Sequence, residues 1–169
     1  YDGLALLGER VTADTLVGND RLAILARYGV GYDAIDVPAC TEAGVLLVIT
    51  PEGVRRPMAA VNLTFLLALS HRLLEQDRLV RAGGWARKGE VRGVGLTGRT
   101  LGTIGLGNIA REFLSLARPL GMRFISHDPY ATPELAAEHG VELVDLETLL
   151  READFVTVAC ALTPDTHHL

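Results

Sequence analysis

The chain has 169 residues, 49% of them hydrophobic, and a formal net charge of −5 at pH 7. This length allows the buried core of one domain or of two small ones, and the hydrophobic fraction excludes a disordered chain. The acidic balance without a basic tract argues against a nucleic-acid partner, and no apolar run is long enough to span a membrane.

Short apolar runs alternate with helical patterns along the chain, which predicts an α/β fold built from parallel strand–helix–strand units. We expect strands at residues 4–7, 22–27, 45–49, 100–105, 123–127 and 154–159, and a short one at 141–144. Helices are expected at residues 12–17, 35–43, 56–82, 108–120, 133–139 and 146–152.

The long helix expected at residues 56–82 divides the chain into two domains, 1–55 and 56–169. Pro57 fits its first turn, where a missing N–H costs nothing. We expect residues 85–98 to form a connecting loop. Apolar side chains recur along the helix at three- and four-residue spacing, which predicts one buried face: Val61, Phe65, Leu66, Leu69, Leu73 and Leu74.

Residues 101–110 are the most informative stretch, because they combine an apolar strand, a glycine turn and the start of a helix. Gly105 permits a tight turn, and Gly107 lets the backbone approach a pyrophosphate. The helix N-terminus offers unpaired N–H groups to phosphates, so Asn108 and Ile109 are the expected pyrophosphate contacts. The Asn108 side chain can also cap this helix.

Asp128 follows Gly107 by 21 residues, at the end of the next expected strand. A carboxylate there accepts hydrogen bonds from both hydroxyls of the adenosine ribose and repels a 2′-phosphate, which favours NAD over NADP. The alternative is a cap of the turn before Pro129. His127 is expected to serve packing or to lie at the surface.

Other candidate chemistry is sparse. Cys40 and Cys160 are too isolated for a disulfide framework or a zinc cluster, which favours a reducing, cytoplasmic setting. No histidine has metal-ligand spacing, and no serine lies in a nucleophile motif.

The turn at residues 29–33 either exposes N–H groups to an anion or is a plain strand–helix turn with Asp33 as the N-cap, and spacing alone favours the plain turn.

Taken together, the motifs of this chain resemble the D-isomer-specific 2-hydroxyacid dehydrogenase family, the group that contains phosphoglycerate dehydrogenases and glyoxylate/hydroxypyruvate reductases. The resemblance covers nearly every residue. It rests on RYGVGYDAID at 27–36, RAGGW at 81–85, LTGRTLG at 96–102, GLGNIA at 105–110, DPY at 128–130, GVELVDL at 140–146 and LTPDT at 162–166.

This resemblance implies a truncated flavodoxin-like substrate domain followed by a Rossmann-type, doubly wound cofactor domain. It implies an NAD-dependent oxidoreductase that acts on a small 2-oxo or 2-hydroxy acid and forms a homodimer. The backbone at Val30 and Gly31 would meet the substrate carboxylate and the nicotinamide end of NAD. Cys160 would line the adenosine side.

The chain also departs from the family pattern. The family's catalytic arginine, glutamate and histidine lie in motifs beyond the third Rossmann strand, so we expect a fragment and assign no catalytic residue here. Asn62 replaces a glutamate that is usual near the start of the long helix, and Ala159 replaces a polar residue. Arg55 and Arg56 either bind a second acidic group of the substrate or are exposed charges.

Two other functions fit parts of the same pattern. The family's scaffold also occurs in NAD-binding corepressors, so a corepressor-like or sensor protein without turnover is one alternative. A Rossmann methyltransferase also pairs a glycine loop with a strand-end acid. The GLGNIA pattern favours a dinucleotide over this second alternative.

Overall fold

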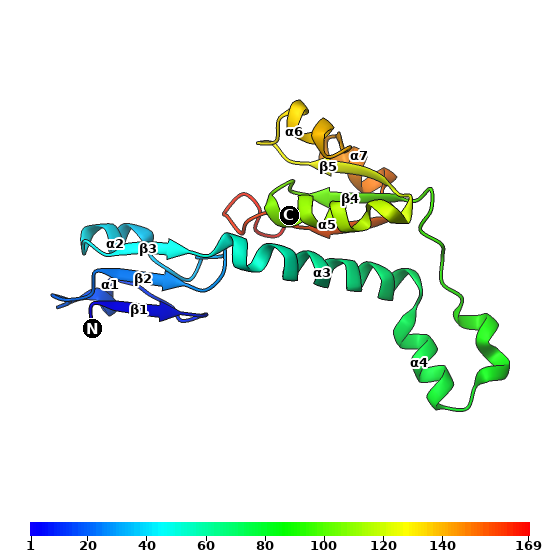
Figure 1. Cartoon of the computed structure of the whole chain (residues 1–169), viewed down its shortest axis with the longest axis horizontal. Coiled ribbons are helices and arrows are strands. Elements are labelled where there is room, and N and C mark those ends of the chain that lie inside the picture. Colours follow the sequence, from blue (N-terminus) through cyan, green and yellow to red (C-terminus); the bar gives the residue numbers. More distant parts are fainter. The chain divides into compact units, whose positions relative to one another are not determined.

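The computed structural model describes all residues from 1 to 169, and they form two compact units (Figure 1). The first unit comprises Tyr1–Val54 and Ala161–Leu169, and the second comprises Arg55–Cys160. The sequence boundary between residues 55 and 56 lies beside this division. Residues 161–169 were expected in the cofactor domain, whereas their contacts group them with the first unit.

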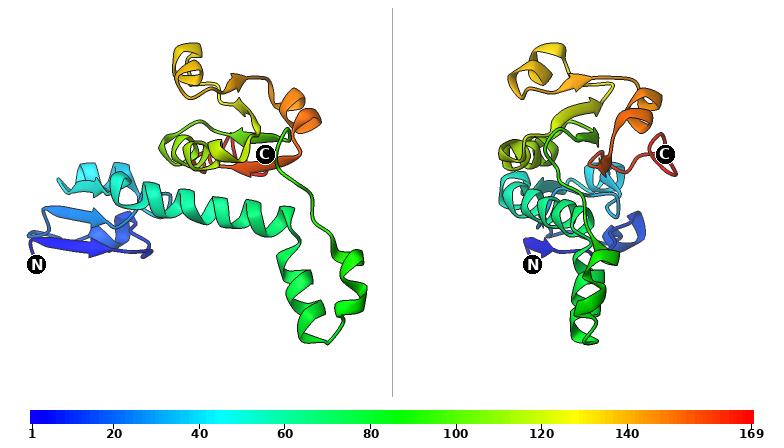
Figure 2. Two further views of the ribbon diagram at one scale, coloured as in Figure 1. Left: turned by 45° about the vertical axis from the view of Figure 1, so that its right-hand side comes forward. Right: turned by 90° about the vertical axis from the view of Figure 1, so that its right-hand side faces the viewer.

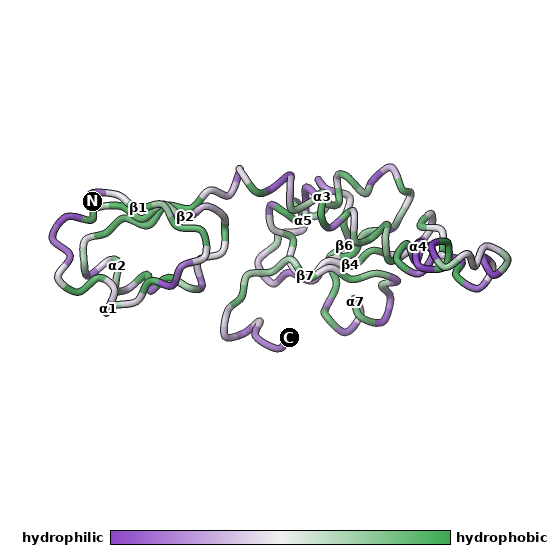
Figure 3. The backbone as a smooth tube through the Cα atoms, turned by 90° about the horizontal axis from the view of Figure 1, so that it is seen from below, coloured by the Kyte–Doolittle hydropathy of each residue, from purple (hydrophilic) through white to green (hydrophobic).

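The first unit is a three-stranded parallel sheet with two short helices. Its strands are β1 (Gly3–Leu6), β2 (Ile24–Arg27) and β3 (Leu46–Ile49), in the order β1-β2-β3, and its helices are α1 (Ala13–Leu16) and α2 (Val37–Glu42). Figure 3 shows hydrophobic residues concentrated along β1 and β2. The buried core consists of Leu6, Val11, Leu16, Leu25, Ile35, Ala39, Cys40 and Val45.

Helix α2 begins later than the sequence predicts, and Asp33 is not its N-cap. The Asp36 carboxylate accepts a hydrogen bond from the Ala39 N–H at 3.0 Å, so Asp36 is the cap. Ile35 cannot be helical because it forms a parallel bridge with Val11 and is buried in the core. The tertiary contact of one apolar residue therefore moves the helix start.

The second unit contains a four-stranded parallel sheet in the order β6-β5-β4-β7. Strand β4 spans Thr100–Ile104, β5 spans Arg123–His127, β6 spans Glu142–Leu143 and β7 spans Phe155–Val158. All five residues of β4 are buried, since this strand has neighbours on both sides. The strands lie where the sequence predicts them, within one or two residues.

Helices cover both faces of this sheet, as the doubly wound prediction requires. They are α3 (Pro51–Ser70), α5 (Asn108–Ala117), α6 (Pro133–Glu138) and α7 (Leu146–Glu152). Helices α3 and α5 pack on one face of β4 and β5, and α7 packs on the other (Figure 1). The first face is sealed by Leu66, Leu101, Phe113, Leu114 and Phe124, and the second by Ile104, Ile125 and Leu149.

Asp154 joins β4 and β7 at their starts. Its carboxylate accepts hydrogen bonds from the Thr100 N–H at 2.8 Å and from the Arg99 guanidinium at 2.7 Å. The bond from the Thr100 N–H, followed by that from Arg99, lowers the pKa of Asp154 below its usual value of 3.8. The carboxylate therefore stays ionised and holds β7 in register beside β4.

The long helix predicted at residues 56–82 is two helices. Helix α3 begins at Pro51, which takes the starting position assigned to Pro57, and Pro57 lies inside the helix. Helix α4 spans Leu73–Arg81 and is bent by 60° from α3. No single helix is both long and apolar enough to cross a membrane, and only this bent pair taken together reaches that length and composition.

The break between α3 and α4 is caused by a segment that returns to it. The Val94 N–H donates to the Ser70 carbonyl at 2.7 Å, and a Cβ on Gly93 would lie 2.4 Å from that carbonyl oxygen. Arg72 adopts a left-handed conformation with φ of 50° and pairs with Glu75. The returning segment includes a 3₁₀ helix, Trp85–Val91, beside α4 (Figure 2), where the sequence predicted only a loop.

The predicted buried face of the long helix is largely exposed. Only Leu66 of that set is buried, whereas Phe65 and Leu69 are 61% and 69% exposed. The face toward the sheet instead carries Ala59, Leu66 and Ser70. The apolar stripe borders a groove of about 660 Å³ against β7, the edge strand of the sheet.

We predict that Gly93→Ala destabilises the second unit by about 1–3 kcal/mol, because its methyl group meets backbone atoms that cannot move aside. Gly95→Ala is the matched control, since nothing lies within 4 Å of its Cβ position. The control should change the free energy of unfolding by less than about 0.5 kcal/mol. Urea unfolding measures both, and equal stability of the two variants would contradict the packed return segment.

Candidate functional site

The candidate site lies at the carboxyl edge of the second sheet. From β4 the chain passes to β5 on one side, and later reaches β7 on the other side of β4. Such a reversal of strand order opens a crevice outside the strand ends, where ligands of doubly wound sheets bind. The segments that leave β4, β5 and β7 carry the residues that the sequence predicts for cofactor binding.

Gly105 makes the turn that leaves β4. Its φ is 95°, a conformation that residues with a side chain rarely adopt. A Cβ at this position would lie 2.9 Å from the backbone nitrogen of Cys160, and the Gly105 N–H donates to the His127 carbonyl at 2.8 Å. The turn is therefore held between the ends of β7 and β5, and only glycine fits there.

Gly107 is the N-cap of α5, which corrects the expectation that Asn108 caps the helix. Gly107 provides no side-chain hydrogen bond to the first turn, and nothing lies within 4 Å of its Cβ position. The backbone N–H groups at Asn108 and Ile109 begin the helix and have no acceptor four residues earlier within it. This open helix end attracts an anion through its dipole and its N–H groups.

Asp128 connects the end of β5 to the glycine turn. One carboxylate oxygen accepts the Leu106 N–H at 2.7 Å, and the other accepts the Tyr130 N–H at 2.8 Å. The second bond is the turn cap that the sequence analysis kept as an alternative. A carboxylate offers about four lone-pair sites, so acceptor capacity remains for a ligand. The Leu106 N–H was missed from sequence, because a backbone donor leaves no side-chain signal.

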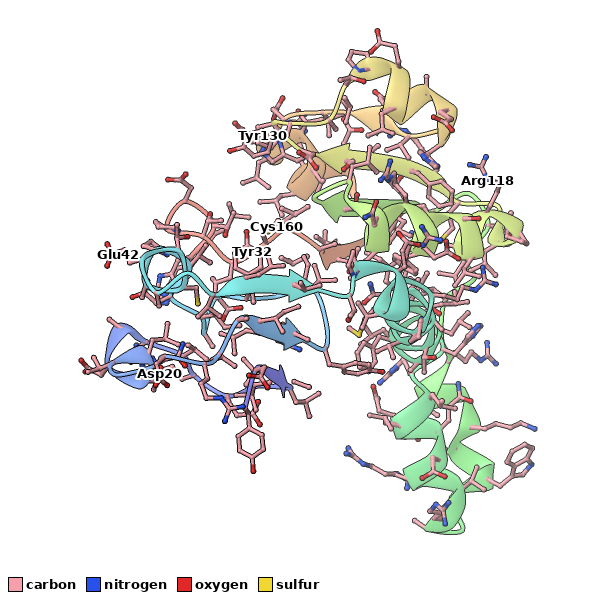
Figure 4. The ribbon with its side chains drawn as sticks, turned by 60° about the vertical axis from the view of Figure 1, so that its left-hand side comes forward. Asp20, Tyr32, Glu42, Arg118, Tyr130 and Cys160 are labelled. Atoms are coloured by element: carbon pink, nitrogen blue, oxygen red, sulfur yellow. The ribbon has the colours of Figure 1, made fainter.

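Cys160 and His127 lie close to this turn. Cys160, labelled in Figure 4, is half-buried. Its backbone lies against the Cβ position of Gly105. The His127 Nδ1 is 3.2 Å from the Val144 carbonyl oxygen, a contact between neighbouring strand ends. The contact agrees with the packing role expected for this histidine.

Val30 and Gly31 belong to the other unit, in the loop that follows β2. Both are exposed, and the loop is tied to the residue after β3: the Gly29 N–H donates to the Thr50 hydroxyl at 2.8 Å, and the Thr50 N–H donates to the Gly29 carbonyl at 2.9 Å. These contacts shape the loop within its own unit. The assignment of Val30 and Gly31 to the substrate and the nicotinamide stays a prediction.

Arg55 and Arg56 both contact the Glu112 carboxylate on α5. The Arg56 Nη1 lies 2.6 Å and the Arg55 Nε 3.7 Å from its oxygens, and the Glu112 side chain is only 18% exposed. The two arginine side chains are exposed, at 41% and 68%, as one alternative predicts, and both also pair with this acid. Their predicted contact with a second acidic group of the substrate stays untested.

A doubly wound parallel sheet with a glycine turn, an open helix N-terminus and a strand-end carboxylate at the switch point defines a dinucleotide-binding domain of the Rossmann class. Residues 63–169 match the family model described as "D-isomer specific 2-hydroxyacid dehydrogenase, NAD binding domain". The chain belongs to this family, as its motifs predict.

Curated relatives agree with this assignment. The chain is 38% identical over 163 residues to D-3-phosphoglycerate dehydrogenase of Methanocaldococcus jannaschii, covering 96% of this chain and 31% of that protein. It is 36% identical over 172 residues to glyoxylate reductase of Thermococcus onnurineus, covering 98% and 52%. The chain thus spans between about a third and a half of the relatives that it matches.

Solved structures give the same fold. The D-lactate dehydrogenase of Aquifex aeolicus, complexed with NAD and lactic acid, superposes with a TM-score of 0.90 at 25% identity, covering 99% of this chain and 50% of that one. The glyoxylate reductase of Paecilomyes thermophila superposes with a TM-score of 0.88 at 28% identity, covering 99% and 53%.

Replacement by alanine should have different effects at the two turn glycines, on stability at Gly105 and on NADH affinity at Gly107. We predict that Gly105→Ala lowers the free energy of unfolding by about 1–3 kcal/mol, because of its positive φ and its contact with Cys160. Gly107→Ala should cost less, no more than about 1 kcal/mol, because its φ is −70° and its surroundings are open, so only the weaker preference of alanine for an N-cap opposes it.

In the same experiment, NADH titration should show at least a tenfold weaker affinity for Gly107→Ala, because its methyl group occupies the side from which a phosphate approaches the helix. Unchanged NADH affinity in this variant would contradict the assignment of the helix end to the pyrophosphate.

Proposed function

We propose that the protein containing this chain is an NAD-dependent oxidoreductase that acts on the CH–OH group of a small D-2-hydroxy acid. One observation carries the proposal: the Asp128 carboxylate holds the glycine turn beside an uncapped helix N-terminus. A strand-end carboxylate in this position is the feature that distinguishes a dinucleotide site from an ordinary glycine turn.

The residues present fit the cofactor. Gly107 leaves space for a phosphate to approach, and the N–H groups at Asn108 and Ile109 supply donors to it. Asp128, which holds the turn, would accept from the ribose hydroxyls, and Cys160, which lies behind the turn, would line the adenosine side. NAD, when bound, supplies the hydride acceptor of the reaction.

The choice of NAD over NADP rests on Asp128. Its carboxylate is half-buried and fixed by two backbone N–H donors, so its negative charge cannot swing away from a ligand. A 2′-phosphate placed against this charge would be repelled, whereas two ribose hydroxyls would each donate a hydrogen bond to it.

At the substrate end, we assign the backbone at Val30 and Gly31 to the carboxylate of the acid. Their loop follows a parallel strand and is exposed, which leaves its N–H groups accessible to an anion. No residue of this chain is assigned to proton transfer, and the identity of the acid is left to the assay.

We also propose a homodimer located in the cytoplasm. Exposed apolar side chains on α3, α4 and the following 3₁₀ helix, including Leu69, Leu74 and Trp85, support an association of copies. The two free cysteines, Cys40 and Cys160, suit a reducing compartment.

The function is tested by following NADH oxidation by the full reading frame with glyoxylate, hydroxypyruvate, pyruvate and bulkier 2-oxo acids. We expect turnover of at least one acid with NADH, and much slower turnover with NADPH. NADH binding without turnover of any 2-oxo acid would contradict the enzyme proposal and favour a corepressor-like or sensor protein.

A substitution tests the cofactor choice separately. Asp128→Asn should weaken NADH binding about tenfold or more, because a charged acceptor for the ribose hydroxyls is lost. It should also narrow the difference between NADH and NADPH, since the repulsion of the 2′-phosphate is removed. Asp145→Asn is the matched control, because Asp145 caps α7 by accepting from the Thr148 N–H. Equal affinities in both variants would contradict the role of Asp128.

A further inference from the structure

A second recess of about 340 Å³ lies along α5, within the second unit. Its lining is almost entirely charged or polar and comes from α3, from one face of α5 and its 3₁₀ extension, and from the end of α6. The lining residues are Arg55, Asn108, Arg111, Glu112, Ser115, Arg118 and His139. Three arginines thus face one glutamate in a chain whose net charge is −5.

The single acid of the recess is already neutralised. The half-buried Glu112 carboxylate is shared by Arg55 and Arg56, at 3.7 and 2.6 Å. Because its charge is already paired, this carboxylate does not by itself repel an anion from the recess.

The other two arginines are held in place by neutral acceptors. The Arg111 guanidinium donates to the Asn108 side-chain oxygen, and the Arg118 guanidinium donates to the His139 carbonyl at 2.7 Å. Such contacts orient a guanidinium without cancelling its charge. By contrast, Arg81 pairs with Asp77 and Arg87 with Glu90, outside the recess.

The structure also makes room for the Arg118 side chain at its end of the recess. Arg118 extends from the C-terminal end of α5 (Figure 4) and passes over Gly140, where a Cβ would lie 3.3 Å from its Nη1. Gly140 has a φ of 62°, so a glycine both makes the turn after α6 and leaves room for the guanidinium. Arg111 and Arg118 are seven residues apart and lie about 10 Å apart along one face of the helix.

We propose that this recess is a binding site for an anion of the phosphate class, separate from the cofactor site. The Arg111 and Arg118 guanidinium groups supply paired N–H donors, and Ser115 between them supplies a hydroxyl. The proposal does not depend on the proposed dehydrogenase activity. Because Asn108 lines the recess and also begins the helix that faces the cofactor, the test must separate the two sites.

The test is calorimetric titration of the full-length protein with inorganic pyrophosphate at low ionic strength, with and without saturating NADH. We expect saturable binding that persists in the presence of NADH. The double variant Arg111→Gln/Arg118→Gln should bind at least tenfold more weakly, since two charge-assisted contacts are lost. The matched control, Arg81→Gln/Arg87→Gln, removes the same charge outside the recess and should stay within about twofold of the wild type.

A third variant keeps the test decisive if the double variant does not fold. Glu112→Gln removes the acid of the recess and should strengthen pyrophosphate binding severalfold. The proposal is overturned by the absence of saturable binding, by loss of binding when NADH is present, or by equal weakening in the two double variants. Unchanged or weaker binding in Glu112→Gln would overturn it as well.

Discussion

The hydrogen bond from the Leu106 N–H to the Asp128 carboxylate is the contact on which the candidate site depends. It links the residue after β5 to the turn after β4, so the position of one strand end determines the shape of the other. Because the donor is a backbone group next to Gly105, the carboxylate restrains the whole glycine turn. The same carboxylate keeps acceptor capacity for a ligand, so one side chain can both shape the turn and contribute to ligand binding.

Backbone packing also fixes the glycine turn. Gly105 lies against the backbone of Cys160, which fixes the turn from the side of β7, and its N–H is bound by the His127 carbonyl at the end of β5. The three strand ends thus position one another without any side chain entering the space in front of Gly107. The helix N-terminus stays open, as the proposed anion-binding role requires.

Much of the second unit could be predicted from sequence because its signals are local. Strand β5 and helix α7 have the predicted bounds, Arg123–His127 and Leu146–Glu152, since apolar periodicity and caps lie within the segments themselves. The wrong predictions concern helix boundaries that are determined by contacts with residues distant in the sequence. The break after Ser70 depends on Gly93, and the late start of α2 depends on the bridge between Val11 and Ile35.

The stripe through Phe65 and Leu69 has helical spacing but lies away from the sheet, because periodicity identifies an apolar face and not what covers it. Spacing indicated Gly105, Gly107 and Asp128 as candidate site residues, whereas their hydrogen-bond partners could not be predicted from it. The Leu106 N–H and the shared Glu112 carboxylate became visible only in three dimensions.

The most direct test of this account is amide hydrogen exchange at Leu106, measured by NMR in the intact protein without cofactor. If the Asp128 carboxylate preorganises the turn, the Leu106 amide will exchange slowly in the wild type and at least tenfold faster in Asp128→Ala. Equal exchange rates in the two proteins, with protection appearing only after NADH is added, would show that the ligand and not Asp128 forms the turn.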